Sequence, residues 1–416
     1  MKKTFGLLGE KLGHSYSPVI HERLGGYEYP LYEISPCDLD AFMTEKKFDG
    51  VNVTIPYKQA VMRYCASLSA EANSIGSVNT IIKDKDGLLH GYNTDCHGFR
   101  VMLQRGNIDP EGKKILVLGG GGSSKTVIYV LSELGAREII TISRKGENNY
   151  TNISRHYDVQ IIVNTTPVGM YPGNGESPVH LDEFKQLEGA ADLIYNPMRT
   201  KLLLDAERLG IPRVNGLAML VCQAEAASRL FLGMDFSGND GEAERSQLTD
   251  KIINAVISRT RNIALIGMPG CGKSTIGKQL AKTLNRPLAD IDELIASCAE
   301  KNIPRIFAED GEETFRGIET RVLGEQAARS GIVIATGGGI VTRPENFNLL
   351  RQNSLIIYLK RGLNELTVSG RPLSGSVGIE TLAKQRLPLY ESWSDCIIDI
   401  EANPGLTVKK ILNTLE

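Results

Sequence analysis

The stretch "IALIGMPGCGKSTIGKQLAKTL", residues 263–284, reads as a strand, a glycine-rich turn and a helix. The turn matches the pattern G-x-x-x-x-G-K-S and lies between a strand and a helix, as that pattern requires. In such a turn the backbone amides surround phosphate groups, the lysine neutralises transferred charge, and the serine hydroxyl is a ligand of Mg²⁺. The stretch therefore predicts a P-loop that binds the phosphates of a nucleotide and Mg²⁺. The expected nucleotide-binding residues, which become ATP-binding residues through the resemblance given below, are Gly267, Gly270, Gly272, Lys273, Ser274 and Thr275, with Lys273 also catalytic and Ser274 also a metal ligand.

A second glycine-rich turn occurs earlier, in "ILVLGGGGSSKTVIYVL" at 115–131, again between a strand and a helix. Without side chains there, backbone amides can approach the pyrophosphate of a dinucleotide at the helix N-terminus. About 24 residues after the first glycine, Ser143-Arg144-Lys145 occupies the place where an NAD site usually has an acidic residue. These cations favour the 2′-phosphate of NADP(H), although a solvated turn with two basic residues is the alternative. The predicted cofactor residues are Gly119, Gly121, Gly122, Ser123, Arg144 and Lys145.

Composition describes an ordinary globular chain that is too long for one core. Its 416 residues favour two or three domains, and 41% hydrophobic residues with a net charge of −2 exclude a disordered or fibrous protein. Basic residues form no run, so we expect neither a nucleic-acid nor a membrane partner. The seven scattered cysteines have no C-x-x-C pair, which argues against structural zinc or a disulfide framework. We expect a cytoplasmic protein with small-molecule substrates; the sequence makes no prediction of oligomeric state.

The order of strands and helices predicts an α/β protein with three parts. Residues 1–100 are expected to form an α/β substrate-binding domain that is completed by C-terminal helices in 216–258. Residues 101–215 are expected to form a Rossmann-like NADP domain. A short joint at 259–262 then leads to a P-loop α/β domain at 263–416, which the resemblance given below implies to be of the nucleoside monophosphate kinase-like class. The helix before the joint has an apolar stripe, which a free linker would not need.

Residues 5 to about 258 resemble shikimate dehydrogenase in the order and spacing of their motifs. These motifs are "GHSYSPVIHE" at 13–22, "GVNVTIPYK" at 50–58, "GSVNTI" at 76–81, "GYNTDCHG" at 91–98, "NTTPVGM" at 164–170 and "NGLAMLVCQA" at 215–224. The resemblance implies that Lys58 and Asp95 form a catalytic pair. It also implies that the substrate contacts Ser15, Ser17, Thr54, Asn79, Tyr195 and Gln223.

Hydride delivery to a ketone leaves negative charge on oxygen, and a positioned ammonium such as Lys58 stabilises that charge. Asp95 would orient the ammonium, although capping of the helix that follows is a second role open to it. The chain departs from the family at Glu22, where asparagine is usual, and at Ser143, where asparagine usually begins the NADP loop. Only about fourteen residues, 145–158, separate that loop from the next strand. We therefore expect one helix or strand of the NADP domain to be lost or shortened.

Residues 262–416 resemble shikimate kinase. The motifs are "LADIDELI" at 288–295, "IFAEDGEETFRGIETRVL" at 306–323, "VIATGGGIV" at 333–341, "GRPL" at 370–373 and "RLPLYE" at 386–391. The resemblance implies that Asp292 is catalytic and binds substrate hydroxyls, that Asp290 lies toward the metal, and that Arg371 reaches ATP from a lid. The implied substrate residues are Asp292, Arg316, Gly337, Gly338, Gly339 and Arg386. Glu319, three residues after Arg316, offers an intrahelical ion pair as an alternative role for that arginine.

Both resemblances lead to one pathway, in which NADPH reduces 3-dehydroshikimate to shikimate and ATP then phosphorylates the 3-hydroxyl of shikimate. Two alternatives stay open from the sequence. The first half could oxidise quinate while the second phosphorylates another metabolite, or one half could be a sensing module without turnover. The presence of Lys58, Asp95, Lys273 and Asp292 together disfavours the sensing module.

Overall fold

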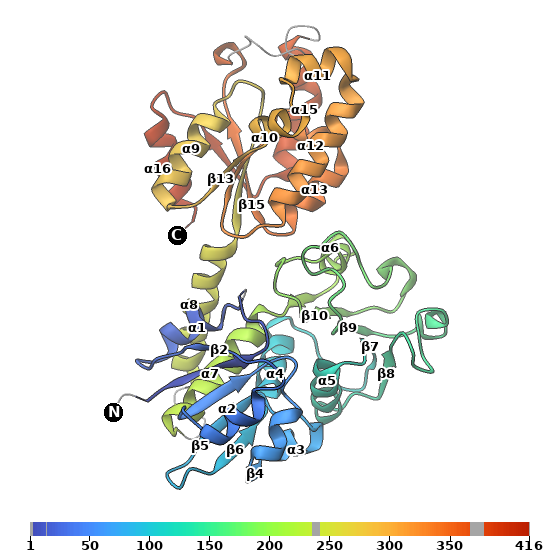
Figure 1. Cartoon of the computed structure of the whole chain (residues 1–416). Coiled ribbons are helices and arrows are strands. Elements are labelled where there is room, and N and C mark those ends of the chain that lie inside the picture. The colour runs from blue at the N-terminus through green and yellow to red at the C-terminus, as the bar shows by residue number, and fades with distance from the viewer. Residues whose placement is uncertain (1–2, 14, 235–241, 367–377, 416) are drawn as a thin grey trace. The chain divides into compact units, whose positions relative to one another are not determined.

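The computed structural model describes residues 3–13, 15–234, 242–366 and 378–415 (Figure 1). The chain forms two compact units. The first contains residues 1–170, 176–195 and 202–256, and the second contains 171–175, 196–201 and 257–416. Arg371, expected to reach ATP from the lid, lies outside the described residues.

The N-terminal sheet has six strands in the order β2-β1-β3-β5-β6-β4. Strands β1, β2 and β3 are parallel, whereas β5 runs antiparallel to both β3 and β6. Val51 and Val53 lie on the same face of β3, because strand side chains alternate, and they pack with Ile81 of β5 in the core of this part. The elements are β1 Phe5–Gly9, α1 Ser17–Leu24, β2 Leu31–Glu33, α2 Leu39–Glu45, β3 Gly50–Val53, β4 Ser67–Leu68, α3 Ala70–Ile75, β5 Thr80–Lys83 and β6 Leu89–Tyr92.

A second sheet has five parallel strands in the order β11-β10-β9-β7-β8. Its central strands are almost wholly apolar and buried, as expected where helices cover both faces of a parallel sheet. The elements are α4 Asp95–Arg105, β7 Lys114–Leu118, α5 Gly122–Glu133, β8 Glu138–Ile142, β9 Ile161–Asn164, β10 Gly189–Asp192, α6 Lys201–Arg208, β11 Arg213–Asn215 and α7 Leu217–Leu232.

The crossover from β8 to β9 contains no α-helix or strand, only a 3₁₀ turn at Ile153–His156. The crossover thus lacks one element, as expected from the sequence, and β8 forms an edge of its sheet. Tyr150, Ile153 and Tyr157 pack against the core on this side. Their side chains cover the apolar surface that a crossover helix would otherwise bury, which explains how the sheet tolerates the shortening.

Helix α8, Glu242–Thr260, leads almost directly into the next sheet, because only Arg261 separates it from β12. Ile252 and Val256 on its predicted apolar stripe are buried, whereas Leu248 is exposed. The boundary between the two compact units falls between Val256 and Ile257, inside this helix. The chain therefore has no unstructured linker between α8 and β12.

The C-terminal sheet has five parallel strands in the order β13-β14-β12-β15-β16, with helices on both faces (Figure 1). The P-loop follows the central strand β12, where strand carboxyl ends form a ligand crevice in such sheets. The elements are β12 Asn262–Ile266, α9 Lys273–Leu284, β13 Leu288–Asp290, α10 Ile291–Ala299, α11 Ile303–Glu309, α12 Gly311–Ala327, β14 Val333–Ala335, α13 Pro344–Arg351, β15 Ser354–Lys360, α15 Ile379–Trp393, β16 Cys396–Asp399 and α16 Pro404–Asn413.

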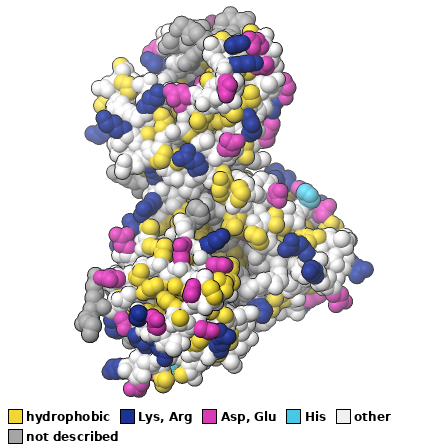
Figure 2. Space-filling view, in the orientation of Figure 1, with side chains coloured by type: hydrophobic (Ala, Val, Ile, Leu, Met, Phe, Trp, Pro, Cys, Tyr) yellow, Lys and Arg dark blue, Asp and Glu magenta, His cyan; other side chains and the backbone are white. Residues whose placement is uncertain are grey.

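Basic and acidic side chains are interspersed on the face of the molecule shown in Figure 2. Within the described ranges, no helix has the length and apolar character needed to cross a membrane.

Candidate active sites

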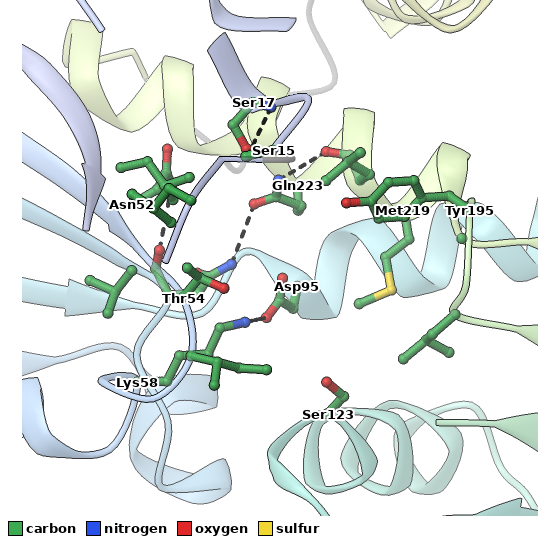
Figure 3. Close-up of a pocket in the computed structure, with 18 of the residues that line it drawn as sticks. Ser15, Ser17, Asn52, Thr54, Lys58, Asp95, Ser123, Tyr195, Met219 and Gln223 are labelled. Atoms are coloured by element: carbon green, nitrogen blue, oxygen red, sulfur yellow. Dashed lines mark hydrogen bonds and ion pairs between the residues drawn. The ribbon is translucent and has the colours of Figure 1, made fainter. Parts of the chain in front are cut away.

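A cavity of about 640 Å³ lies in the first unit, within the size range of small-molecule sites (Figure 3). Its walls come from the N-terminal sheet, from the starts of α4 and α5, and from α7. The predicted residues that line it are Ser15, Ser17, Thr54, Lys58, Asn79, Asp95, Ser123, Tyr195 and Gln223. Folding thus gathers every predicted dehydrogenase substrate residue and both members of the predicted catalytic pair.

Lys58 and Asp95 form an ion pair in this cavity, with Nζ donating to Oδ2 at 2.6 Å (Figure 3). Their side chains are 26% and 14% exposed, so solvent screens the pair only partly. Asp95 is the first residue of α4, where the helix dipole favours a carboxylate. Thr94 occupies the N-cap position, and the Asp95 side chain turns to Lys58 instead of capping the helix.

A buried amide links the cavity to the start of α4. Asn79 accepts a hydrogen bond from Thr94 N at 2.8 Å and donates to Thr94 Oγ1 at 3.0 Å. Asn79 Nδ2 also donates to Gln223 Oε1 at 3.5 Å, the upper limit of such a bond. α4 and α7 approach closely at Gly98, which has no side chain; a Cβ atom there would lie 2.5 Å from Met219 O. Gly98 therefore helps to place Gln223 on the cavity wall.

Asn52 also lines the cavity, and sequence reasoning missed it. It is buried in β3, where its Oδ1 accepts from the Tyr29 hydroxyl at 2.7 Å and its Nδ2 donates to Thr80 Oγ1 at 3.0 Å. A signal was present, because an asparagine inside a buried apolar strand needs polar partners.

His21 is fully buried beside this network but does not line the cavity. Burial lowers the pKa of His21 to about 3, so the ring is neutral at ordinary pH. The Tyr27 hydroxyl donates to Ser228 Oγ at 2.8 Å and therefore accepts from His21 Nδ1 at 2.8 Å. His21 also stacks on Tyr29 with ring centroids 3.8 Å apart, which makes it part of the packing behind α1.

The predicted cofactor turn lies at the N-terminus of α5. Gly119 has φ 109°, and a side chain there would lie 2.7 Å from Thr165 Oγ1, so only glycine fits. Gly121 is the N-cap and Gly122 begins the helix, which leaves the first amides available to an anion. This construction fits a dinucleotide pyrophosphate. Of the predicted cofactor residues, Ser123 lines the cavity, whereas Gly119, Gly121, Gly122, Arg144 and Lys145 do not.

Arg144 and Lys145 are exposed in a tight turn after β8. Ser143 N donates to Asn148 O at 3.1 Å, which closes the turn. The turn presents both cations to solvent, as binding of a phosphate would require.

The P-loop of the second unit is shaped by glycines with positive φ. At Gly267, with φ 147°, a side chain would lie 2.6 Å from Leu359 O. Lys273 is buried, and its Nζ donates to Gly267 O at 2.8 Å and to Met268 O at 3.0 Å. The ammonium therefore stays at the turn, and Ser274 follows it, exposed, in the first turn of α9. This arrangement fits a triphosphate.

The glycines after β14 make room for two side chains that are predicted to bind the substrate, Asp292 and Arg316. A side chain at Gly337 would lie 2.8 Å from Asp292 Oδ1. One at Gly339 would overlap both terminal nitrogens of Arg316. The sequence requires glycine here because the backbone itself packs against these polar groups.

Arg316 is buried, and its Nη1 donates to Glu319 Oε2 at 2.6 Å. The intrahelical pair considered from the sequence is thus present, and Glu312 adds a longer contact of 3.2 Å to Nη2. Burial raises the pKa of Glu319, while Arg316 opposes that shift. Asp290 accepts from Glu293 N at 3.4 Å and caps α10, whose first turn carries Asp292.

Comparison with known proteins identifies both units. Residues 7–81 match the family model of the shikimate dehydrogenase substrate binding domain. The NADP(+)-dependent shikimate dehydrogenase of Clostridium perfringens (strain SM101 / Type A) is 38% identical over 254 residues, covering 56% of this chain and 93% of the relative. The chain belongs to the shikimate dehydrogenase family. Residues 269–416 match the family model of shikimate kinase.

Solved structures agree for the dehydrogenase part. A chorismate mutase/shikimate 5-dehydrogenase fusion protein from Clostridium acetobutylicum has a TM-score of 0.56 and 34% identity, covering 62% of this chain and 97% of that one. The shikimate 5-dehydrogenase of Thermus thermophilus, in complex with NADP(H) and shikimate, has a TM-score of 0.53 and 29% identity, covering 60% and 99%. Together with the kinase match, these likenesses confirm the predicted α/β fold class. The roles assigned to individual site residues stay predictions.

Proposed function

We propose that this chain catalyses two consecutive steps of chorismate and aromatic amino acid biosynthesis. The dehydrogenase part reduces 3-dehydroshikimate to shikimate with NADPH, and the kinase part phosphorylates shikimate to shikimate 3-phosphate with ATP and Mg²⁺. The observation that carries the proposal is that one chain joins a dehydrogenase cavity containing the Lys58–Asp95 pair to a P-loop unit of the next enzyme's family.

In the dehydrogenase site, NADPH supplies the hydride when bound. Lys58 Nζ, held by Asp95 at 2.6 Å, donates a proton to the oxygen on which negative charge develops. Ser15 and Ser17 hold the substrate carboxylate, and Ser17 N already donates to Ser15 Oγ at 3.2 Å. Their positions at the start of α1 place an anion near a helix N-terminus.

In the kinase site, ATP supplies the phosphoryl group when bound. Asp292 accepts a hydrogen bond from the substrate alcohol and orients its oxygen for in-line attack. Arg316 and Arg386 hold the carboxylate, since planar guanidinium groups suit that shape. Lys273 neutralises phosphate charge, and the expected ligands of Mg²⁺ are Ser274 and Asp290.

We further propose that residues 1–100 with 216–258 bind the first substrate, that 101–215 bind NADP(H), and that 263–416 form the kinase after a joint at 259–262. The partners are small molecules, and the proposed location is the cytoplasm.

A single reaction mixture tests the proposal. The chain is incubated with 3-dehydroshikimate, NADPH, ATP and Mg²⁺, and the organic product is followed by mass spectrometry. Shikimate 3-phosphate should accumulate. Lys58→Ala should strongly reduce the formation of shikimate, whereas Asp292→Ala should let shikimate form but leave it unphosphorylated. Accumulation of unphosphorylated shikimate by the parent chain would refute the kinase assignment, and faster turnover of quinate with NAD would refute the dehydrogenase assignment.

A further inference from the structure

Tyr390 lies beneath the glycine turn of the kinase site and has no role in the function proposed above. It is fully buried in α15, and its ring stacks on Tyr358 of β15 with centroids 5.2 Å apart. Its hydroxyl donates a hydrogen bond to the Gly338 carbonyl oxygen. Burial raises the pKa of Tyr390 far above its ordinary value, so this hydroxyl keeps its proton.

The same carbonyl oxygen accepts a second hydrogen bond, from Arg386 Nη1 at 3.0 Å. Arg386 is only 4% exposed, and its Nε is buried without a partner among the described residues. An unpaired buried donor is costly, and a carboxylate would satisfy it with a charge-assisted bond. Burial lowers the pKa of Arg386, the adjacent Tyr390 side chain opposes that shift, and the nearby Arg316 guanidinium lowers the pKa further. Because two guanidinium groups lie close together, an anion between them is favoured.

The Gly338 peptide is also held from the P-loop side. A side chain at Gly338 would lie 2.5 Å from Pro269 Cγ, so the backbone packs directly on the P-loop. With this contact and the Tyr390 hydroxyl in place, the carbonyl has one orientation. Because Arg386 Nη1 binds that oxygen, the carbonyl decides where the Nε edge of the guanidinium points.

We propose that Tyr390 is a positioning residue of the kinase site: its hydroxyl fixes the Gly338 carbonyl, and that carbonyl orients Arg386 toward the substrate carboxylate. The assignment rests on the proposed function, which places the carboxylate at Arg386. It adds a residue that does not touch the substrate.

The test uses Tyr390→Phe in the full chain, which removes one oxygen and keeps the stacked ring. The KM for shikimate should rise about tenfold, because one hydrogen bond from a charged group is weakened. The kcat should stay within about threefold, and the KM for ATP should not change, because the P-loop is intact. Tyr358→Phe is the matched control: it removes a hydroxyl from the other ring of the stacked pair and should leave all three constants unchanged.

A double variant separates positioning from general packing. In the Arg386→Ala background, Tyr390→Phe should change the KM for shikimate by less than about twofold, since the residue through which it acts is gone. A further tenfold rise in that background would overturn the proposal, as would an unchanged KM in the single variant or an equal loss of affinity for ATP. A parent chain that fails to phosphorylate shikimate overturns the proposed function itself, whereas an active parent with a silent Tyr390→Phe overturns only the role of Tyr390.

Discussion

Replacing Lys58 by alanine removes the ammonium that lies 2.6 Å from Asp95 Oδ2 in the dehydrogenase cavity. Acid–base assistance of this kind is worth about 10²- to 10⁴-fold in rate, or roughly 3–5 kcal/mol of activation free energy. We expect kcat for reduction of 3-dehydroshikimate to fall by about that factor, measured by the loss of NADPH absorbance. The KM should change much less, because Ser15, Thr54 and the other polar groups of the cavity remain.

The same substitution leaves the Asp95 carboxylate, which is 14% exposed, without its cation. A mostly buried charge that loses its partner costs about 1–3 kcal/mol of unfolding free energy. Calorimetry should therefore show a melting temperature for the dehydrogenase part lower by several degrees.

Two controls make the result interpretable. Lys83→Ala removes the last residue of β5, a lysine of the same unit whose Nζ donates to Lys46 O at 2.9 Å, and it should leave kcat within about twofold of the parent value. The kinase rate of the Lys58→Ala chain should equal that of the parent. A loss of dehydrogenase kcat below tenfold would refute the assignment of Lys58 as the proton donor.

Three further outcomes are expected. Arg144→Ala should raise the KM for NADPH about 10- to 100-fold while leaving that for NADH unchanged, because it removes a charge-assisted bond to the 2′-phosphate; equal effects on both would contradict the NADP assignment. Gly339→Ala should raise the KM for shikimate at least tenfold, since a methyl group would overlap the Arg316 guanidinium; unchanged kinetics would show that this packing is absent. For His21, the folded pKa of about 3 lies below the ordinary 6.5, so the unfolded state binds more protons between these values. Unfolding free energy should therefore fall as pH drops from about 6.5 toward 3, by up to about 1.4 kcal/mol per pH unit from this group. Denaturant titrations at several pH values should show that the unfolding free energy of His21→Asn depends less steeply on pH than that of the parent chain.

Most of the fold could be read from the sequence because parallel sheets leave strong local signals. Two apolar segments, which end at Leu118 and at Ile266, are each followed by a glycine turn and a helical pattern. In the structure each segment is a strand of a parallel sheet. The shortened crossover was also visible as a count of residues. Its packing was not, because the sequence does not say that Tyr150 and Tyr157 fold back to cover the sheet.

Prediction of which residues line the cavity was more complete where they belong to a motif that is contiguous in the sequence. Asn52 was missed because one asparagine in a strand indicates a polar environment but not which cavity it faces. The hydrogen bond from the Tyr390 hydroxyl to Gly338 O was missed for a similar reason, since the two residues are 52 positions apart along the chain.

The sequence by itself determined the two glycine turns that we predict to bind phosphate, because each needs only a strand, a few glycines and the first amides of the following helix within about twenty residues. The tertiary structure alone decided which side chains meet across long separations. Lys58 and Asp95 are 37 residues apart, and Asn79 and Gln223 are 144 apart. Such contacts depend on how sheets and helices pack, which fixes the burial and direction of each side chain but leaves no local pattern in the chain.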